Sequence, residues 1–247
     1  MLREVTAMLP GENIVYLGDT ARVPYGIRSP GTVRRYSFEC ADFLMKKNIK
    51  LLVVACNTVS ATSLPELQRE VSVPVVGVIE PGARAAVTAT KSRRIGIIGT
   101  EATIKSGAYL KAITSLDKNI EAFGLACPLF VPLVEEGWTD GDIARMIAEK
   151  YLKEMKTRGT DTLVLGCTHY PLLKDLIQEV MGRVTLIDSA VETARVVKDL
   201  LRERALLRPE DTAGSCTFFV TDSPERFISV GERFLQKKIG HIEQVTL

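Results

Sequence analysis

Seven short apolar runs, separated by longer amphipathic segments, restrict the folds that this sequence can adopt. Each run is rich in Val, Ile, Leu or Phe, and the seven lie at residues 13–17, 51–55, 75–79, 94–99, 162–166, 184–188 and 217–220. Short continuous apolar runs are typical of parallel strands that are covered on both faces. Strands that alternate with helices in this way predict an α/β fold with doubly wound parallel sheets.

Several helix boundaries can be read from the residues between the runs. Ser29 and Pro30 have the pattern of an N-cap and a first-turn proline at the start of an amphipathic helix. Asp140 is expected to cap another helix, which would end near Gly159. Pro65 is expected to divide the segment after residue 56 into two short helices.

Charge and hydropathy argue against several classes of protein. The 247 residues include 32 Lys and Arg against 30 Asp and Glu, so the net charge is +2. This balance argues against a dedicated nucleic-acid-binding protein, and no apolar run approaches the roughly 18 residues of a membrane span. The first ten residues lack the basic and then apolar layout of a signal peptide. We therefore expect a cytoplasmic protein that binds neither nucleic acid nor a membrane.

Five cysteines are scattered along the chain without a CxxC pair. An odd number without an export signal argues against a disulfide framework. Cys167 and His169 are two positions apart, but nothing supplies the other half of a structural zinc site. We therefore predict no metal site and interpret Cys40, Cys127 and Cys216 as small buried apolar residues.

Two stretches of the chain resemble each other. Residues 51–58 read LLVVACNT and residues 162–169 read TLVLGCTH, and each continues through a helix into another strand that meets a carboxylate. The second half has an extra strand in front, within residues 93–103. Its counterpart in the first half would precede Met1, because residues 2–9 have the pattern of an amphipathic helix. The repeat predicts that the chain begins one strand late; a chance likeness between two apolar strands is the alternative.

Cys56 and Cys167 each follow a predicted strand, at the turn into a helix. Ligands of open α/β sheets bind beyond the carboxyl ends of strands. A helix N-terminus presents unpaired N–H groups, which would stabilise a thiolate and lower its pKa. The neighbouring polar groups, Asn57 and Thr58 in one case and Thr168 and His169 in the other, can hold a small anionic ligand.

Two matched cysteines on equivalent elements can flank one substrate from opposite faces. Such a pair suits inversion at carbon: one thiolate removes a proton, and the opposing thiol delivers a proton to the other face. The resulting carbanion needs stabilisation by preorganised donors. Backbone N–H groups, threonine hydroxyls and a protonated His169 are the candidates.

Five motifs carry a resemblance to a known family: GDTARVPYG (18–26), VVACNTVSA (53–61), IGTEATIKSG (98–107), CPLFVPLVEEG (127–137) and LGCTHYPLL (165–173). The chain resembles the cofactor-independent aspartate/glutamate racemases, and the glutamate racemases among them, over nearly its whole length. The resemblance implies two α/β domains related by pseudo-twofold symmetry, with the active site at their interface. We expect the first domain to comprise residues 1–79 and 189–247, and the second residues 80–188.

The resemblance also implies roles for individual residues. Cys56 matches the base that attacks D-glutamate, Cys167 the base that attacks L-glutamate, and His169 the residue that assists Cys167. Substrate-binding positions are expected at Tyr25, Gly26, Asn57, Thr58, Thr100, Thr103, Glu135 and Thr168. The implied function is the cofactor-independent supply of D-glutamate for peptidoglycan synthesis, by a homodimer.

The chain departs from the family pattern at its start. Members begin with a strand that ends in a DSGxGG turn, and this segment does not precede Met1 here. Without it, we expect impaired folding and severely reduced racemisation. An aspartate racemase is the rival enzyme, and a non-catalytic protein that binds an acidic ligand or a regulatory partner is the rival from another class. A thiol redox enzyme ranks lower, because neither cysteine has a nearby resolving partner in the sequence.

Overall fold

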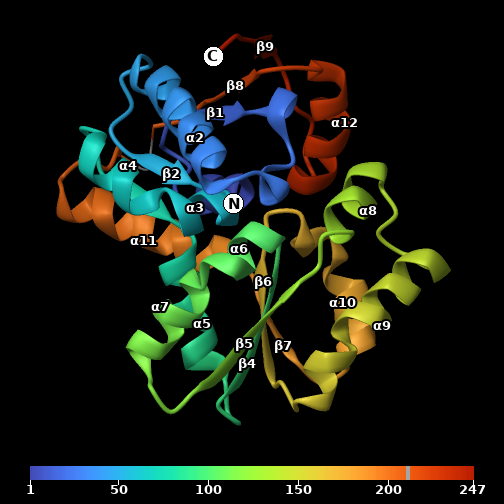
Figure 1. The fold of residues 1–247 in the computed structure, drawn as a ribbon. Coiled ribbons are helices and arrows are strands. Elements are labelled where there is room, and N and C mark those ends of the chain that lie inside the picture. The colour runs from blue at the N-terminus through green and yellow to red at the C-terminus, as the bar shows by residue number, and fades with distance from the viewer. Residues whose placement is uncertain (210–211) are drawn as a thin grey trace.

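A computed structural model describes residues 1–209 and 212–247, which form two α/β lobes (Figure 1). The lower lobe in Figure 1 contains a four-stranded sheet in which every neighbouring pair of strands is parallel. Its order is β5-β4-β6-β7. The strands are β4 (Arg94–Gly99), β5 (Glu121–Ala126), β6 (Thr162–Gly166) and β7 (Thr185–Ile187).

Helices cover both faces of this sheet. The helices α5 (Ile79–Ala89) and α7 (Ala108–Leu116) pack with Ile97 and Val164 in one apolar cluster. The helices α9 (Gly141–Thr157) and α10 (Lys174–Met181) pack with Ile98 and Leu163 in the other. Successive strand residues therefore point into different layers, as expected for a strand that is buried on both faces. The prediction of a doubly wound α/β fold is confirmed in this lobe.

The upper lobe divides its parallel strands between two sheets. One has the order β1-β8-β9, and the other pairs β2 with β3. The strands are β1 (Ile14–Gly18), β2 (Leu52–Val54), β3 (Val75–Gly77), β8 (Cys216–Val220) and β9 (Ile242–Gln244). In the described residues, no hydrogen-bonded ladder joins these two sheets.

The helices of the upper lobe come from both ends of the chain. Val5 and Leu9, in or next to the first helix, share an apolar cluster with Val197 and Leu201 of α11 (Ser189–Glu203). Figure 1 shows the two chain ends in this lobe, with the last helix beside β1 and above α8 (Phe130–Glu136). The helices are α1 (Leu2–Met8), α2 (Pro30–Met45), α3 (Asn57–Thr62), α4 (Leu64–Glu70), α11 (Ser189–Glu203) and α12 (Pro224–Leu235).

Local signals for the helices are mostly confirmed. The Ser29 side chain accepts a hydrogen bond from the backbone N–H of Thr32 at the start of α2. The segment after residue 56 does break into α3 and α4, with Pro65 in the first turn of α4. Asp140 is the N-cap of α9, but its side chain makes no capping hydrogen bond, so that part of the prediction was wrong. Its extended backbone precedes Gly141, which has φ +79°.

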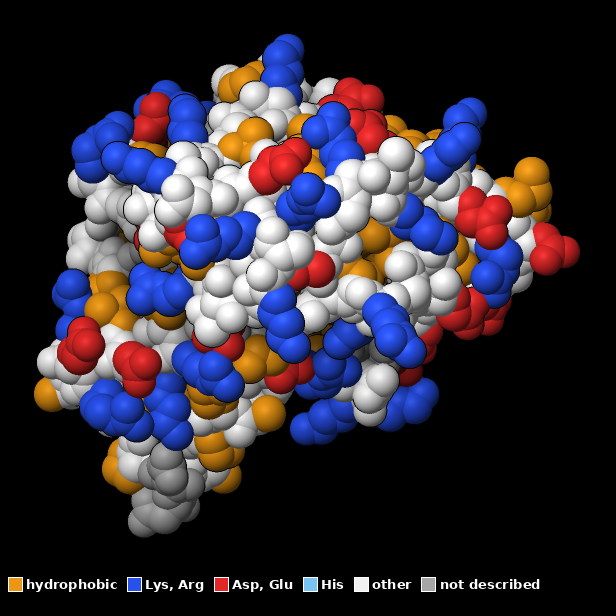
Figure 2. All heavy atoms as spheres, turned by 90° about the horizontal axis from the view of Figure 1, so that it is seen from below, with side chains coloured by type: hydrophobic (Ala, Val, Ile, Leu, Met, Phe, Trp, Pro, Cys, Tyr) orange, Lys and Arg blue, Asp and Glu red, His pale blue; other side chains and the backbone are white. Residues whose placement is uncertain are grey.

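Charged side chains of both signs share the surface. Figure 2 shows Lys and Arg spread over the face seen from below, with Asp and Glu among them. Some are paired, for example Arg158 with Glu154 at 2.8 Å. None of the helices in the described residues combines the length and the apolar character needed to cross a bilayer.

Candidate active site

Cys56 and Cys167 occupy equivalent positions in the two lobes. Cys56 lies between β2 and the first turn of α3, and Cys167 follows directly after β6. Both thus lie at the carboxyl ends of parallel strands, where ligands of such sheets bind. The two thiols are also close enough that Cys167 contributes to raising the pKa of Cys56. The neighbours of the two cysteines, Asn57 and Gly166, both lie against the side chain of Tyr109, so the two cysteine turns face each other between the lobes.

The pKa of Cys56 differs from the prediction. Burial raises it to about 11, and the backbone N–H groups of Val59 and Thr58, which favour the thiolate, offset only part of this effect. The expectation that the helix N-terminus lowers the pKa of this thiol was therefore wrong. The physical reason is that burial destabilises the charged thiolate by more than the N–H groups at the start of a short helix stabilise it.

His169 connects Cys167 to a carboxylate. Its Nδ1 lies 3.8 Å from the Sγ of Cys167, and its Nε2 lies 2.7 Å from Oε1 of Glu135, on the helix α8 (Phe130–Glu136). Burial opposes the charged imidazole, but its contacts with Cys167 and Glu135 prevail and raise its pKa to about 9. The same hydrogen bond from His169 lowers the pKa of Glu135. At neutral pH, His169 is therefore protonated.

Three buried threonine hydroxyls meet across the two lobes. Thr58 Oγ1 lies 3.0 Å from Thr100 Oγ1 and 3.2 Å from Thr103 Oγ1, and the last two lie 3.0 Å apart. Thr100 also caps the helix α6 (Glu101–Ser106), because its side chain accepts a hydrogen bond from the N–H of Thr103. The structure thus brings these three predicted substrate-binding residues together, and their contact with a substrate stays a prediction.

Gly26 packs directly against this threonine cluster. A Cβ at position 26 would overlap the side chain of Thr100, so only glycine allows this approach. Gly26 lies in the one-turn helix Tyr25–Ile27, which brings a loop of the upper lobe to α6 of the lower lobe. The loop after β1 therefore forms one wall of the site.

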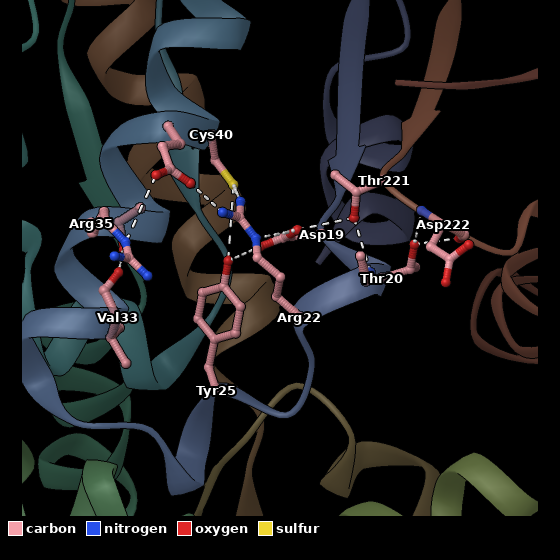
Figure 3. Close-up of polar contacts among 12 residues, drawn as sticks. Asp19, Thr20, Arg22, Tyr25, Val33, Arg35, Cys40, Thr221 and Asp222 are labelled. Atoms are coloured by element: carbon pink, nitrogen blue, oxygen red, sulfur yellow. Dashed lines mark hydrogen bonds and ion pairs between the residues drawn. The ribbon is translucent and has the colours of Figure 1, made fainter. Parts of the chain in front are cut away.

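A polar network in the upper lobe holds this loop (Figure 3). The Tyr25 hydroxyl donates to Asp19, whose other oxygen accepts from Thr221 at 2.9 Å. Arg22 binds Asp19 at 2.7 Å and also pairs with Glu39. Burial raises the pKa of Tyr25, so its phenol is neutral and donates. The hydroxyl of Tyr25 thus donates its proton to Asp19. The sequence analysis included Asp19 in the motif at residues 18–26 but did not name it as a site residue.

The sequence analysis did not identify the buried Tyr109 as a residue of the site. The hydroxyl of Tyr109, in the first turn of α7, lies 2.6 Å from Oδ1 of Asn57. Asn57 follows Cys56, so this hydrogen bond joins the lower lobe to the first cysteine turn. No sequence signal points to it, because the two residues are 52 positions apart.

The predicted site residues thus separate into two groups. Cys56, Cys167 and His169 lie between the strand ends with Gly26 and the polar residues Asn57, Thr58, Thr100, Thr103 and Thr168. Thr168 is exposed, with its Oγ1 3.4 Å from Nδ1 of His169. In the second group, the Tyr25 hydroxyl is hydrogen-bonded to Asp19, and the Glu135 carboxylate is hydrogen-bonded to His169. Within the described residues, no group of three or more His, Cys, Asp or Glu side chains is arranged to hold a metal ion.

Comparisons with known proteins identify the family. The Asp/Glu/hydantoin racemase family matches residues 1–197. A glutamate racemase of Geobacter metallireducens is 56% identical over 248 aligned positions, which cover 100% of this chain and 92% of that protein. The chain belongs to the Asp/Glu/hydantoin racemase family.

Solved structures agree with this assignment. A glutamate racemase isoform of Bacillus anthracis superposes with a TM-score of 0.95 at 41% identity, covering 100% of this chain and 92% of that one. A glutamate racemase of Francisella tularensis, solved with D-glutamate, superposes with a TM-score of 0.93 at 36% identity, covering 99% and 92%. This racemase therefore shares the two-lobed α/β fold of those enzymes, and it is an amino-acid racemase, an isomerase.

Proposed function

We propose that this racemase interconverts L- and D-glutamate without a cofactor, with Cys56 and Cys167 as its two bases. The observation that carries the proposal is a pair of thiols after matched strand ends, near enough to interact electrostatically, one of them beside a protonated histidine. The names of the relatives and the D-glutamate in one similar structure support glutamate as the substrate.

The two thiols act from opposite faces of the α-carbon. The thiolate of Cys56, the minor form at neutral pH because burial raises the pKa of this thiol to about 11, takes the α-proton of D-glutamate, and the electron pair stays on the carbon as a carbanion. The thiol of Cys167 then gives its proton to the other face and becomes the thiolate. For L-glutamate the roles are exchanged. Each turnover breaks one C–H bond and forms another, so no electrons leave the substrate.

His169 and the threonine cluster supply the charge stabilisation that this step needs. The imidazolium lies against Cys167 and can exchange a proton with it or stabilise the developing carbanion. Asn57, Thr58, Thr100, Thr103 and Thr168 offer neutral donors to the substrate carboxylates, with Tyr25 and Gly26 on the adjoining loop. Glu135 acts through His169 rather than on the substrate.

The proposal extends to the setting of the enzyme. The domains comprise residues 1–79 with 189–247 and residues 80–188, related by pseudo-twofold symmetry. The enzyme is a cytoplasmic homodimer that supplies D-glutamate for peptidoglycan. Exposed apolar side chains at Leu129, Trp138, Ile143 and Met146 support an association surface. The additional N-terminal strand stays a prediction, which folding and racemase assays of this chain and an extended chain would test.

Cysteine variants test the proposed function. Cys56→Ser and Cys167→Ser should each lower the racemisation of glutamate by at least about 10³-fold, because a serine hydroxyl is a far weaker acid than a thiol. Cys216→Ser, on strand β8, is the matched control and should retain activity. Polarimetry with glutamate and with aspartate also separates the two substrates. Faster turnover of aspartate, or full activity of either variant, would overturn the proposal.

A further inference from the structure

Tyr109 touches the turns of both cysteines from a single buried position. Its side chain is 3% exposed, and its hydroxyl donates to Asn57, the residue after Cys56. Its ring lies beside Gly166, the residue before Cys167: a Cβ built on Gly166 would be 3.3 Å from Cε2 of Tyr109. One side chain of the lower lobe therefore contacts the neighbours of both proposed bases.

The tyrosine also lies where the chain passes between the lobes. A Cβ on Gly82, in α5, would be 3.3 Å from the Tyr109 hydroxyl oxygen and 3.1 Å from the Cβ of Ser189. Ser189 begins α11. The absence of a side chain at Gly82 thus allows α5, α7 and α11 to converge on the hydroxyl of Tyr109.

The hydrogen bond fixes which end of the Asn57 amide points to the tyrosine. Burial raises the pKa of Tyr109, the Ser189 side chain beside its hydroxyl lowers it in part, and Asp188 and Cys167 raise it further, so the phenol keeps its proton and donates it. The Asn57 oxygen must then face Tyr109. Among the described residues, the Asn57 side chain has no other hydrogen-bond partner, which leaves its NH₂ group free to donate.

We propose that Tyr109 is a positioning residue, which orients the Asn57 amide so that its NH₂ group binds a carboxylate of the substrate. The proposal rests on the proposed function, because it assigns Asn57 to an acidic substrate. Tyr109 itself touches neither the substrate nor the reacting atoms. It couples the lower lobe to a donor of the upper lobe, so the donor is in place only when the two lobes are together.

Tyr109→Phe removes this hydrogen bond and keeps the ring. The KM for both glutamate enantiomers should rise about tenfold, because an amide that can rotate presents its oxygen to the carboxylate part of the time. The kcat should change less than about threefold, since neither thiol is altered. Tyr170→Phe is the matched control: it also loses one buried hydroxyl, which donates to the carbonyl of Cys127 at 2.8 Å. It should lower the unfolding temperature to a similar extent and leave KM unchanged.

A double-mutant cycle shows whether Tyr109 acts through Asn57. In an Asn57→Ala background, Tyr109→Phe should change the KM by less than about twofold. The affinity for D-glutamate, measured from ligand-dependent thermal stabilisation, gives the same comparison without turnover. An unchanged KM in Tyr109→Phe alone, or equal rises in both backgrounds, would overturn the proposal.

Two further results keep the test decisive. If Tyr109→Phe does not fold, Asn57→Asp serves instead, because it keeps an acceptor for Tyr109 and loses the NH₂ donor; an unchanged KM would contradict the proposal. If the wild-type chain binds D-glutamate without racemising it, the proposed function fails. The binding cycle still decides the role of Tyr109 in that case.

Discussion

The Oε1 atom of Glu135 lies 2.7 Å from Nε2 of His169, while Nδ1 of the same ring lies 3.8 Å from the sulfur of Cys167. The imidazole thus stands between a carboxylate and a proposed base. This arrangement explains why His169 is charged at neutral pH in spite of its burial. It also joins Glu135 directly to His169, while the expected contact of Glu135 with the substrate stays a prediction.

Glu135→Gln should lower the pKa of His169. The amide removes the negative charge that stabilises the imidazolium, so the alkaline limb of kcat/KM for L-glutamate should move down by about one pH unit. Glu136→Gln is the matched control, because that side chain is exposed and pairs with Arg226 at 3.4 Å. Identical pH profiles for the wild type and Glu135→Gln would show that Glu135 does not set the charge of His169.

The stability of the fold should also depend on the proton of His169. Its pKa is about 9 in the folded chain against an ordinary value of 6.5, so the stabilisation is complete below pH 6.5 and is lost as the pH rises through 9. The loss is roughly 3 kcal/mol at most. His169→Asn should flatten this part of the profile of unfolding free energy against pH. His241→Asn, which alters the other, exposed histidine, should not.

Gly26→Ala should destabilise the wall of the site. The new methyl group would overlap Thr100, and an overlap of this kind costs about 1–3 kcal/mol and moves the loop. Denaturant unfolding and the KM for glutamate measure the two effects. Gly31→Ala is the control, because nothing lies within 4 Å of a Cβ at that position of α2. A Gly26→Ala variant as stable and active as Gly31→Ala would contradict this packing.

The sequence predicted those parts of the fold that depend on local pattern. All seven apolar runs contain strands, because a strand buried on both faces needs a continuous apolar segment. The strand β5 was missed, since EAFGLA is only half-buried and contains Gly124. The strand β9 was missed because it is three residues long and largely exposed.

The candidate site was predictable only where its residues lie beside the cysteines. Cys56 and Cys167 follow apolar strands, and their polar neighbours are visible in the sequence. The raised pKa of Cys56 and the contact of Tyr109 with Asn57 depend on burial between two lobes. Such effects come from tertiary packing, which no local pattern encodes.

Racemisation of protiated L-glutamate in deuterium oxide tests the two-base account most directly. Mass spectrometry of the separated enantiomers should find early D-glutamate fully deuterated at the α-carbon, because its new hydrogen comes from the opposing thiol. The remaining L-glutamate should keep its original hydrogen. Early D-glutamate that retains the substrate hydrogen would contradict the account, since it would mean that one group both removes and returns the proton.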